Sequence, residues 1–198
     1  MEGLRKIETL VEIKAGYQHR PADELTEAGS FLLIQQKDIF PDRTRIHYAH
    51  AARISPKRKH TRQILKDGDV LFINKGHAPF ACVVRDLPQP AIASSAFFIL
   101  TSESSSLFPE YLAWSLNRKQ VKRELFRAAG RGSKMPVIHR QVLEQQLIPL
   151  PALETQKIVT KLHHLAIMEK EIMHQLTEEK TQLIRAVCEK LILKTKPV

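Results

Sequence analysis

The stretch IPLPALETQKIV, residues 148 to 159, separates two kinds of sequence in this chain of 198 residues. Before it, short apolar runs alternate with turns that contain glycine or proline. After it, no glycine or proline interrupts residues 153 to 193, and an uninterrupted run of this length favours one long helix. The sequence therefore predicts a folded domain over residues 1–151 and a helical arm over residues 152–198.

The predicted arm carries an apolar stripe whose members recur at steps of mostly three, four and seven residues. That spacing puts them on one face of a helix, and a helix of this length would extend roughly 60 Å. A small domain does not need so long a helix to cover its own core, so we expect a coiled-coil-type helix that pairs with a partner helix. Two ordinary helices with a break near Thr177 are the alternative. The stripe consists of Ile158, Leu162, Leu165, Ile172, Leu176, Leu183, Val187 and Leu191.

Residues 1–151 read as short strands followed by helices. Pro109 suits the first turn of a helix and Gly130 its C-terminal cap, so residues 108–130 are predicted to be helical, as are residues 137–147. The opening LRKIETLVEIKAG fits either a strand or a helix. These elements predict an α+β fold in which a small mixed sheet is flanked by helices. The strands are expected at residues 31–35, 69–73, 80–84 and 96–100, which are apolar runs rich in Ile, Val and Phe.

The formal net charge of +10 at pH 7 is concentrated in two places. From Arg43 to Lys66 the sequence contains eight Lys or Arg residues and no acidic residue. From Arg118 to Lys134 it contains seven, against the single acid Glu124. Such clusters suit a polyanion because each neutralised phosphate releases counterions. We therefore expect a surface that binds nucleic acid; a solvated basic face that only aids solubility is the alternative.

The sequence lacks the motifs that would indicate catalysis by this chain. It contains no Gly-x-Gly-x-x-Gly, Walker lysine loop, Gly-x-Ser-x-Gly elbow or His-Glu-x-x-His. Asp69 and Asp86 flank apolar runs, where acids more often form turns, so we expect no metal site and no cofactor bound by this chain. Cys82 and Cys188 suggest no disulfide framework, and no apolar run is long enough to cross a bilayer, which favours a reducing, cytoplasmic setting.

Several segments, in order along the chain, resemble the specificity (S) subunit of type I restriction–modification systems. IPLPALETQKIV is the most telling, because in that family a proline-rich turn of this kind ends a target recognition domain and starts a long conserved helix. The family has two recognition domains and two long helices in one chain, whereas this sequence has one of each, so the resemblance implies a half-length form. The other segments are GYQHRP (16–21), LLIQQKDI (32–39), LKDGDVLFINKG (65–76), PEYLAWSLN (109–117) and GSKMPVIHRQVLEQQL (132–147).

The resemblance implies a non-catalytic, sequence-specific DNA-binding subunit of a restriction–modification or related phage-defence system. It would direct a separate DNA methyltransferase (M) subunit, which uses S-adenosylmethionine, and a nuclease subunit could join the complex. The arm would bind the M subunit and would pair with the arm of a second copy to rebuild the family's antiparallel helices, so that two copies read inversely repeated half-sites of double-stranded DNA. One copy reading an undivided site is the alternative. The rival functions are a protein-interaction scaffold with a basic surface and a small nuclease.

Within this resemblance, the polar turn at Asn74, Lys75 and His77 would be presented to DNA, where Asn and Lys can bond base edges. An exposed loop without a partner is the alternative. The loop GRGSKMP, residues 130–136, fits a phosphate cradle or a plain connection between helices. The dense basic run at residues 57–62 suits phosphate contact.

The remaining candidates lie nearer the N-terminus. Arg43, Arg45 and His47 are two residues apart, so they would share one face of an extended stretch. Gln36 and Lys37 follow a predicted strand, where an amide could read adenine. The full set of candidate DNA-binding residues is Arg20, Gln36, Lys37, Arg43, Arg45, His47, Lys57, Arg58, Lys59, Arg62, Asn74, Lys75, His77, Arg131, Ser133 and Lys134.

Overall fold

The computed structural model describes residues 3–19, 24–25, 28–56, 63–76, 78–102, 104–129 and 136–194. These residues belong to two compact units, Met1–Ile158 and Val159–Val198. The first unit, called the domain below, contains all the strands of the described residues together with the shorter helices. The second unit consists of the greater part of one long helix.

The elements follow one another in a strand-rich half and a helix-rich half. The strands are β1 (Leu4–Lys6), β2 (Val11–Ala15), β3 (Glu24–Leu25), β4 (Phe31–Ile34), β5 (Ala52–Ser55), β6 (Val70–Ile73), β7 (Ala81–Val83), β8 (Ala91–Ala93), β9 (Phe97–Ser102) and β10 (Leu147–Pro149). The helices are α1 (Pro109–Asn117), α2 (Lys119–Ala128), α3 (Arg140–Glu144) and α4 (Leu153–Lys194), and short 3-10 turns span Ile7–Thr9, Gln36–Asp38 and Tyr48–His50.

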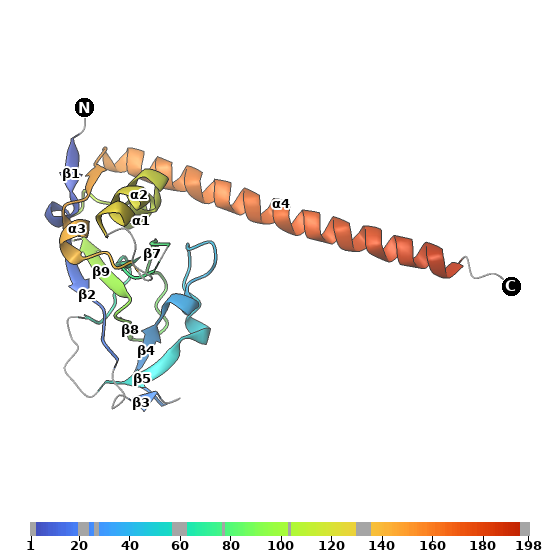
Figure 1. Cartoon of the computed structure of the whole chain (residues 1–198), viewed down its shortest axis with the longest axis horizontal. Helices are drawn as coiled ribbons and strands as arrows, with labels where there is room; N and C mark the ends of the chain where they lie inside the picture. Colours follow the sequence, from blue (N-terminus) through green and yellow to red (C-terminus); the bar gives the residue numbers. More distant parts are fainter. Residues whose placement is uncertain are drawn as a thin grey trace. The chain divides into compact units, whose positions relative to one another are not determined.

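The strands form two four-stranded sheets and one two-stranded ladder. The first sheet has the order β2-β9-β6-β7, and its neighbours are all antiparallel. The second has the order β3-β5-β4-β8 and is mixed, because β4 and β8 run parallel. The four predicted strands are confirmed as β4, β6, β7 and β9, and the predicted α+β fold is confirmed. In Figure 1, α1, α2 and α3 gather at one end of the domain, whereas β3 and β5 lie at the other.

One apolar core joins the two sheets. Leu32 and Ile34 of β4 belong to the same buried cluster as Leu71 of β6 and Ile99 of β9. Leu33, which alternates with them along β4, faces a second, smaller cluster, as the two-residue period of a strand requires. Strands buried on both faces explain why the sequence shows continuous apolar runs rather than an alternation of apolar and polar residues.

The segment predicted as one helix over residues 108–130 is two helices. Arg118 separates α1 from α2 with an extended backbone (φ −59°, ψ 136°). Just before it, the Asn117 side chain accepts from the Ala81 N–H at 3.1 Å and donates to the Ala81 carbonyl at 2.7 Å. This paired contact holds the end of α1 against β7, and α2 leaves in a new direction. Gly130, the predicted cap, lies outside the described residues, and α2 ends at Ala128.

The first strand of the chain pairs with the last. Leu4 lies opposite Pro149 and Lys6 opposite Leu147 in the antiparallel β1–β10 ladder. The ambiguous opening segment is therefore two strands, β1 and β2, separated by a 3-10 turn. Just after β2, Gly16 crosses β8 so closely that a Cβ atom would lie 2.1 Å from the Ser94 carbonyl oxygen. Only glycine allows the two backbones to approach in this way.

The arm is one continuous helix. Residues Leu153–Lys194 of α4 show no interruption, and Figure 1 draws them as a single ribbon. Thr177, where a break was the alternative, donates its hydroxyl to the Met173 carbonyl at 2.8 Å, as a threonine inside a helix can. The alternative of two shorter helices is therefore wrong.

Candidate DNA-binding surface

The segment between β4 and β5 forms a short hairpin that carries predicted DNA-binding residues. His47 N–H donates to the Asp38 carbonyl at 2.6 Å, and Phe40 N–H donates to the Arg45 carbonyl at 3.0 Å. At the turn, Arg43 has a φ of 63°, which few non-glycine residues adopt. The expected extended row of three side chains on one face is therefore wrong at Arg43, which sits in the turn.

Arg45 and His47 are held by aromatic contacts on this hairpin. The Arg45 guanidinium lies 4.8 Å from the centre of the Phe40 ring, and the His47 ring stacks on the same ring with a centroid distance of 5.0 Å. His50 extends the stack, 3.5 Å from His47. Side chains restrained in this way lose less conformational freedom when they bind a ligand. The hairpin therefore presents a partly ordered set of donors.

Gln36 and Lys37 lie beside this hairpin in the 3-10 turn that follows β4, and both are exposed. The turn is anchored by Asp38, whose Oδ2 accepts from the Gln35 N–H at 2.8 Å. The Asp38 side chain is buried and its Oδ1 has no partner among the described residues. Burial raises the pKa of Asp38 above its usual value. The backbone of Gln36 and Lys37 is thus held by the Asp38 contact, and their exposed side chains can contact a ligand.

The predicted tip at residues 74–77 is paired to another segment. Gly76 N–H donates to the Pro136 carbonyl at 3.0 Å, and Ile138 N–H donates to the Asn74 carbonyl at 2.8 Å. Lys75 lies opposite Val137 in an isolated bridge. These contacts place the tip beside Pro136, the last residue of the predicted phosphate loop. No feature of the sequence indicated this pairing. Two candidate segments far apart in sequence therefore meet.

The side chains of the tip differ in accessibility. Lys75 is exposed and Gly76 adopts a φ of +105°, which glycine tolerates. Asn74 differs from the expectation of an exposed base-reading residue, because it is only 8% exposed and its Oδ1 has no partner among the described residues. Of the described tip residues, Lys75 is therefore the one whose side chain can reach a ligand.

Several candidates lie outside the described residues, so the structure does not place them, and their roles stay predictions. They are Arg20, Lys57, Arg58, Lys59, Arg62, His77, Arg131, Ser133 and Lys134.

Lys122 of α2 is a cationic residue that the sequence did not single out. The Arg43 guanidinium lies 5.0 Å from the centre of the Phe80 ring. Phe80 directly precedes Ala81, whose backbone is bonded by the Asn117 side chain at the end of α1. Lys122 follows one helical turn after Arg118, whose carbonyl accepts its N–H. Its side chain is half-buried, and burial, followed by the charge of Arg43, lowers its pKa to about 8. Lys122 and Arg43 therefore repel each other, and a bound anion such as a phosphate would offset both this repulsion and the desolvation of Lys122.

The acids weighed for a nuclease site are engaged in turns. Asp69 accepts from the Lys66 N–H at 2.8 Å and from the Thr101 hydroxyl at 2.7 Å, and Asp86 has a turn conformation with a φ of 53°. In the described part of the chain, no group of three or more His, Cys, Asp or Glu residues could hold a metal ion. Asp69 thus has the turn-forming role expected for it.

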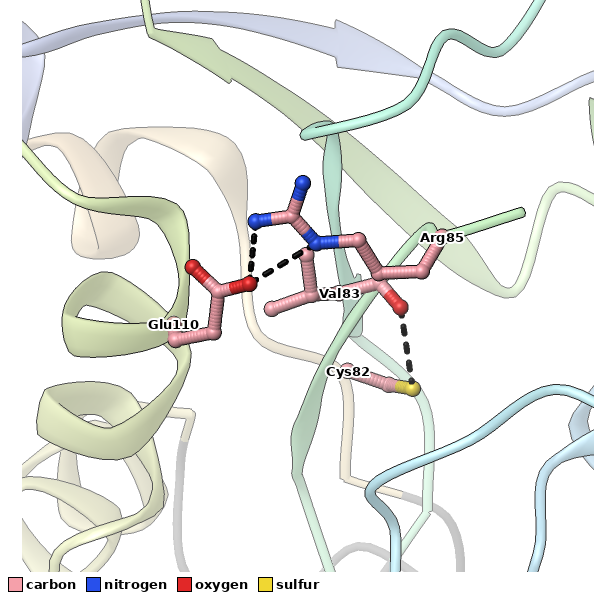
Figure 2. Close-up of polar contacts among 4 residues, drawn as sticks. All are labelled: Cys82, Val83, Arg85 and Glu110. Carbon is pink, nitrogen blue, oxygen red and sulfur yellow. Dashed lines mark hydrogen bonds and ion pairs between the residues drawn. The ribbon is translucent and has the colours of Figure 1, made fainter. Parts of the chain in front are cut away.

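The one buried thiol near charged groups is a packing residue. Figure 2 shows Arg85 donating through its guanidinium to Glu110 Oε1, with an Nε–O distance of 2.8 Å. Cys82 lies nearby and donates its thiol to the Val83 carbonyl at 3.6 Å. Burial raises the pKa of Cys82 to about 12, so the thiol remains protonated and unreactive. The Arg85–Glu110 pair ties the segment that follows β7 to the first turn of α1.

The apolar stripe of α4 is exposed along its whole length. Its eight members range from 48% exposed at Val187 to 65% exposed at Leu183. None of the helices among the described residues is both long and apolar enough to span a membrane. A row of exposed aliphatic residues on one helix indicates a binding surface.

Comparison with known proteins finds solved structures with a similar fold. No protein-family model and no curated protein matches the chain. Among solved structures, it resembles a chain from a study of complex assembly and conformational transition of the type I R-M system, with a TM-score of 0.67 and 18% sequence identity. That match covers 95% of this chain and 45% of the other.

Two further solved structures have the same fold. The HsdS subunit from Thermoanaerobacter tengcongensis matches with a TM-score of 0.58 and 17% identity, over 85% of this chain and 37% of that subunit. The type I restriction–modification S subunit from M. genitalium matches with a TM-score of 0.55 and 14% identity, over 98% of this chain and 46% of that subunit. The chain thus spans less than half the length of each, and the resemblance expected from the sequence is confirmed for the fold.

Proposed function

We propose that this chain is a sequence-specific DNA-binding subunit of a restriction–modification or related phage-defence system. It selects the target and carries out no catalysis. A separate methyltransferase subunit, which uses S-adenosylmethionine, modifies the selected site, and the chain itself binds no cofactor. The observation that carries the proposal is the fold, which follows that of type I specificity subunits over most of this chain.

The residues of the domain suit this role. The hairpin presents Arg45 and His47 on an aromatic stack, and Lys75 is exposed on the tip that meets residues 136–138. Arginine, lysine and histidine donate to phosphates and to base edges in the major groove. The described cations come from segments far apart in sequence, as expected for a protein that contacts several positions along a duplex.

The arm supplies the other half of the proposal. The exposed stripe of α4 has no core of its own to cover within Val159–Val198. Burial of its aliphatic residues against other helices would be favourable at about 25 cal/mol per Å² of apolar surface. We assign this face to the methyltransferase subunit and to the arm of a second copy of the chain, running antiparallel to the first. Two copies related by a two-fold axis would read a bipartite site with inversely repeated halves.

The proposal is tested by selecting DNA with the purified full chain, alone and with its methyltransferase. A pool of random duplexes is bound at physiological salt, recovered and sequenced, and methylation of the enriched duplex is then mapped. We expect a discrete target bound at least about a thousandfold more tightly than unrelated duplex, with methylation at that target. Equal binding to every duplex would overturn the proposal.

The same experiment separates the rival scaffold function, which the exposed stripe also favours. A scaffold with a basic surface would bind all DNA weakly and through phosphates alone, so its affinity would fall steeply with salt and show no sequence preference. A specificity subunit retains a sequence preference at every salt concentration at which it binds. Enrichment of no sequence, together with capture of acidic proteins, would favour the scaffold.

A further inference from the structure

The exposed face of α4 follows an eleven-residue repeat. Ile158, Glu169, Lys180 and Leu191 are each eleven residues apart. Eleven residues make three turns at 3.67 residues per turn, so positions repeated in this way stay on one face of a nearly straight helix. Within each repeat, the residues four and seven positions further on share that face. These are Leu162 and Leu165, then Met173 and Leu176, then Ile184 and Val187.

All of these positions are apolar except two. The apolar ones are between 48% and 62% exposed, and Ile172 and Leu183 border the same face. The exceptions are Glu169 and Lys180, which are also exposed. A carboxylate and an ammonium in an otherwise aliphatic row cost desolvation energy on pairing unless each meets the other. On a single copy they cannot meet, because eleven residues separate them by about 16 Å.

The face is symmetric about the midpoint between His174 and Gln175. Glu169 lies as far before this point as Lys180 lies after it, and Ile158 corresponds in the same way to Leu191. The pairing of two antiparallel arms belongs to the proposed function. We propose that Glu169 and Lys180 set the register of that pair, which is centred on this midpoint, so that Glu169 of each copy lies opposite Lys180 of the other. This inference deepens the proposed function and rests on it for the biological role of the pair.

In this register, every apolar position of the repeat meets an apolar position. Ile158 lies opposite Leu191 of the second copy, Leu162 opposite Val187, Leu165 opposite Ile184 and Met173 opposite Leu176. Each relation occurs twice because the axis is two-fold. The two Glu–Lys pairs then interrupt the aliphatic layers at matching places, and each charge has a partner of opposite sign.

Other arrangements of the same helices fail at the charges. A parallel pair in register places Glu169 against Glu169 and Lys180 against Lys180, and like charges in contact are unfavourable. An antiparallel pair shifted by eleven residues places one of the two charges opposite the same residue of the other copy. The other charge then lies opposite an aliphatic residue. Polar residues inside a helical interface commonly specify register and orientation at some cost in stability. Glu169 and Lys180 therefore choose the arrangement, while the aliphatic residues supply the affinity.

The register is tested by disulfide trapping in the full chain. In a Cys188→Ser background, copies carrying Leu162→Cys and copies carrying Val187→Cys are co-expressed with different tags and oxidised. We expect a disulfide between the two kinds of chain and none when either variant is present alone, because two copies of the same position lie more than about 30 Å apart in this register. Cys82 is 1% exposed and does not interfere. A disulfide in either variant alone indicates a parallel pair and overturns the proposal.

Charge exchange tests the selecting residues. Glu169→Lys alone places Lys opposite Lys twice, and Lys180→Glu alone places Glu opposite Glu twice, so each is expected to weaken self-association roughly tenfold in sedimentation equilibrium. The double variant Glu169→Lys/Lys180→Glu restores the wild-type affinity, since the pairs reform with opposite polarity. Glu171→Lys, the same charge change on the opposite face of the helix, is the control and leaves self-association unchanged. A double variant as weak as the single variants overturns the proposal.

These outcomes can be separated from failure of the proposed function. Selective DNA binding by a chain that forms no 162–187 disulfide, or that remains a monomer, overturns the register and leaves the DNA-binding role intact. A 162–187 disulfide in a chain that binds every duplex equally supports the register and removes the DNA-binding role.

Discussion

The domain and the arm place the same residue type in opposite surroundings. Leu100 of β9 is 0% exposed and belongs to a sheet buried between other elements, whereas Leu176 of α4 is 56% exposed. The sequence contains aliphatic runs in both regions, and only their periodicity distinguishes them. The difference teaches that the domain holds its shape through its own core, whereas the aliphatic face of the arm has no such burial among the described residues, which is why the proposed function gives it partners.

The sharpest way to break this comparison is to remove the same atoms from both regions. Leu100→Ala should lower the free energy of unfolding of the domain by about 2–5 kcal/mol. Leu176→Ala should change it by less than about 0.5 kcal/mol, because exposed positions contribute little. Trp114 of α1 is the only tryptophan, so its fluorescence during urea unfolding reports on the domain alone. Equal losses in the two variants would mean that the domain's stability depends on the arm.

The second test charges the arm and leaves the domain unchanged. Leu165→Asp combined with Leu176→Asp places uncompensated carboxylates in the aliphatic face. We expect association with the methyltransferase subunit and with a second copy to weaken at least a hundredfold, or about 2.7 kcal/mol. Pull-down and analytical ultracentrifugation measure this loss, and an unchanged Trp114 transition controls for folding. Full association of the double variant would remove the role proposed for α4.

The third test separates base reading from phosphate contact within the domain. Lys75→Ala, alone and with His77→Ala, should cost about 1–3 kcal/mol of discrimination for each base contact that is lost. Replacing Lys57, Arg58 and Lys59 by Ala should instead weaken binding to all duplexes and reduce its salt dependence. Binding titrations on target and scrambled duplexes at several salt concentrations measure both effects, with Lys6→Ala, an exposed lysine outside both basic clusters, as a matched control. If neither set affects target binding, these segments do not contact DNA.

The smallest expected effect is a pH dependence from Lys122. Its pKa is about 8 in the free domain, and a bound phosphate would raise it, so binding takes up a proton above pH 8. Affinity for DNA should therefore be constant below this pH and fall as pH rises above it, by no more than about tenfold per pH unit. Titrations between pH 7 and 9.5 measure the slope, and Lys122→Arg should abolish it while retaining affinity. The same slope in the arginine variant would exclude Lys122 as its source.

Much of the fold could be predicted because its strongest signals are local. Each of the four predicted strands is an apolar run bounded by turn residues, and the arm is a long run without helix breakers. The missed strands β3, β5, β8 and β10 are short, and β8 consists of Ala-Ile-Ala, which has weak strand propensity. The break at Arg118 depends on the contact between Asn117 and Ala81, which are 36 residues apart and carry no local signal.

The candidate surface was predictable in its residue types and less so in its arrangement. Spacing identified Arg43, Arg45 and Lys75 as basic residues outside the core. It could not reveal that the tip at Lys75 is paired to Val137, because that ladder joins distant segments. Nor could it single out Lys122, which resembles any other helix lysine until the fold half-buries it near Arg43.

The β1–β10 ladder has a consequence for how such a protein can change. Because Leu4 lies beside Pro149, the chain enters and leaves the domain on adjacent strands, about 5 Å apart. The segment between Leu4 and Pro149 can then be replaced by another folded sequence whose two ends also lie on adjacent strands. The helix that begins at Leu153 would remain joined to the domain at the same point. Under the proposed function, a lineage would in this way acquire a new DNA target in a single recombination event and keep the partners assigned to α4.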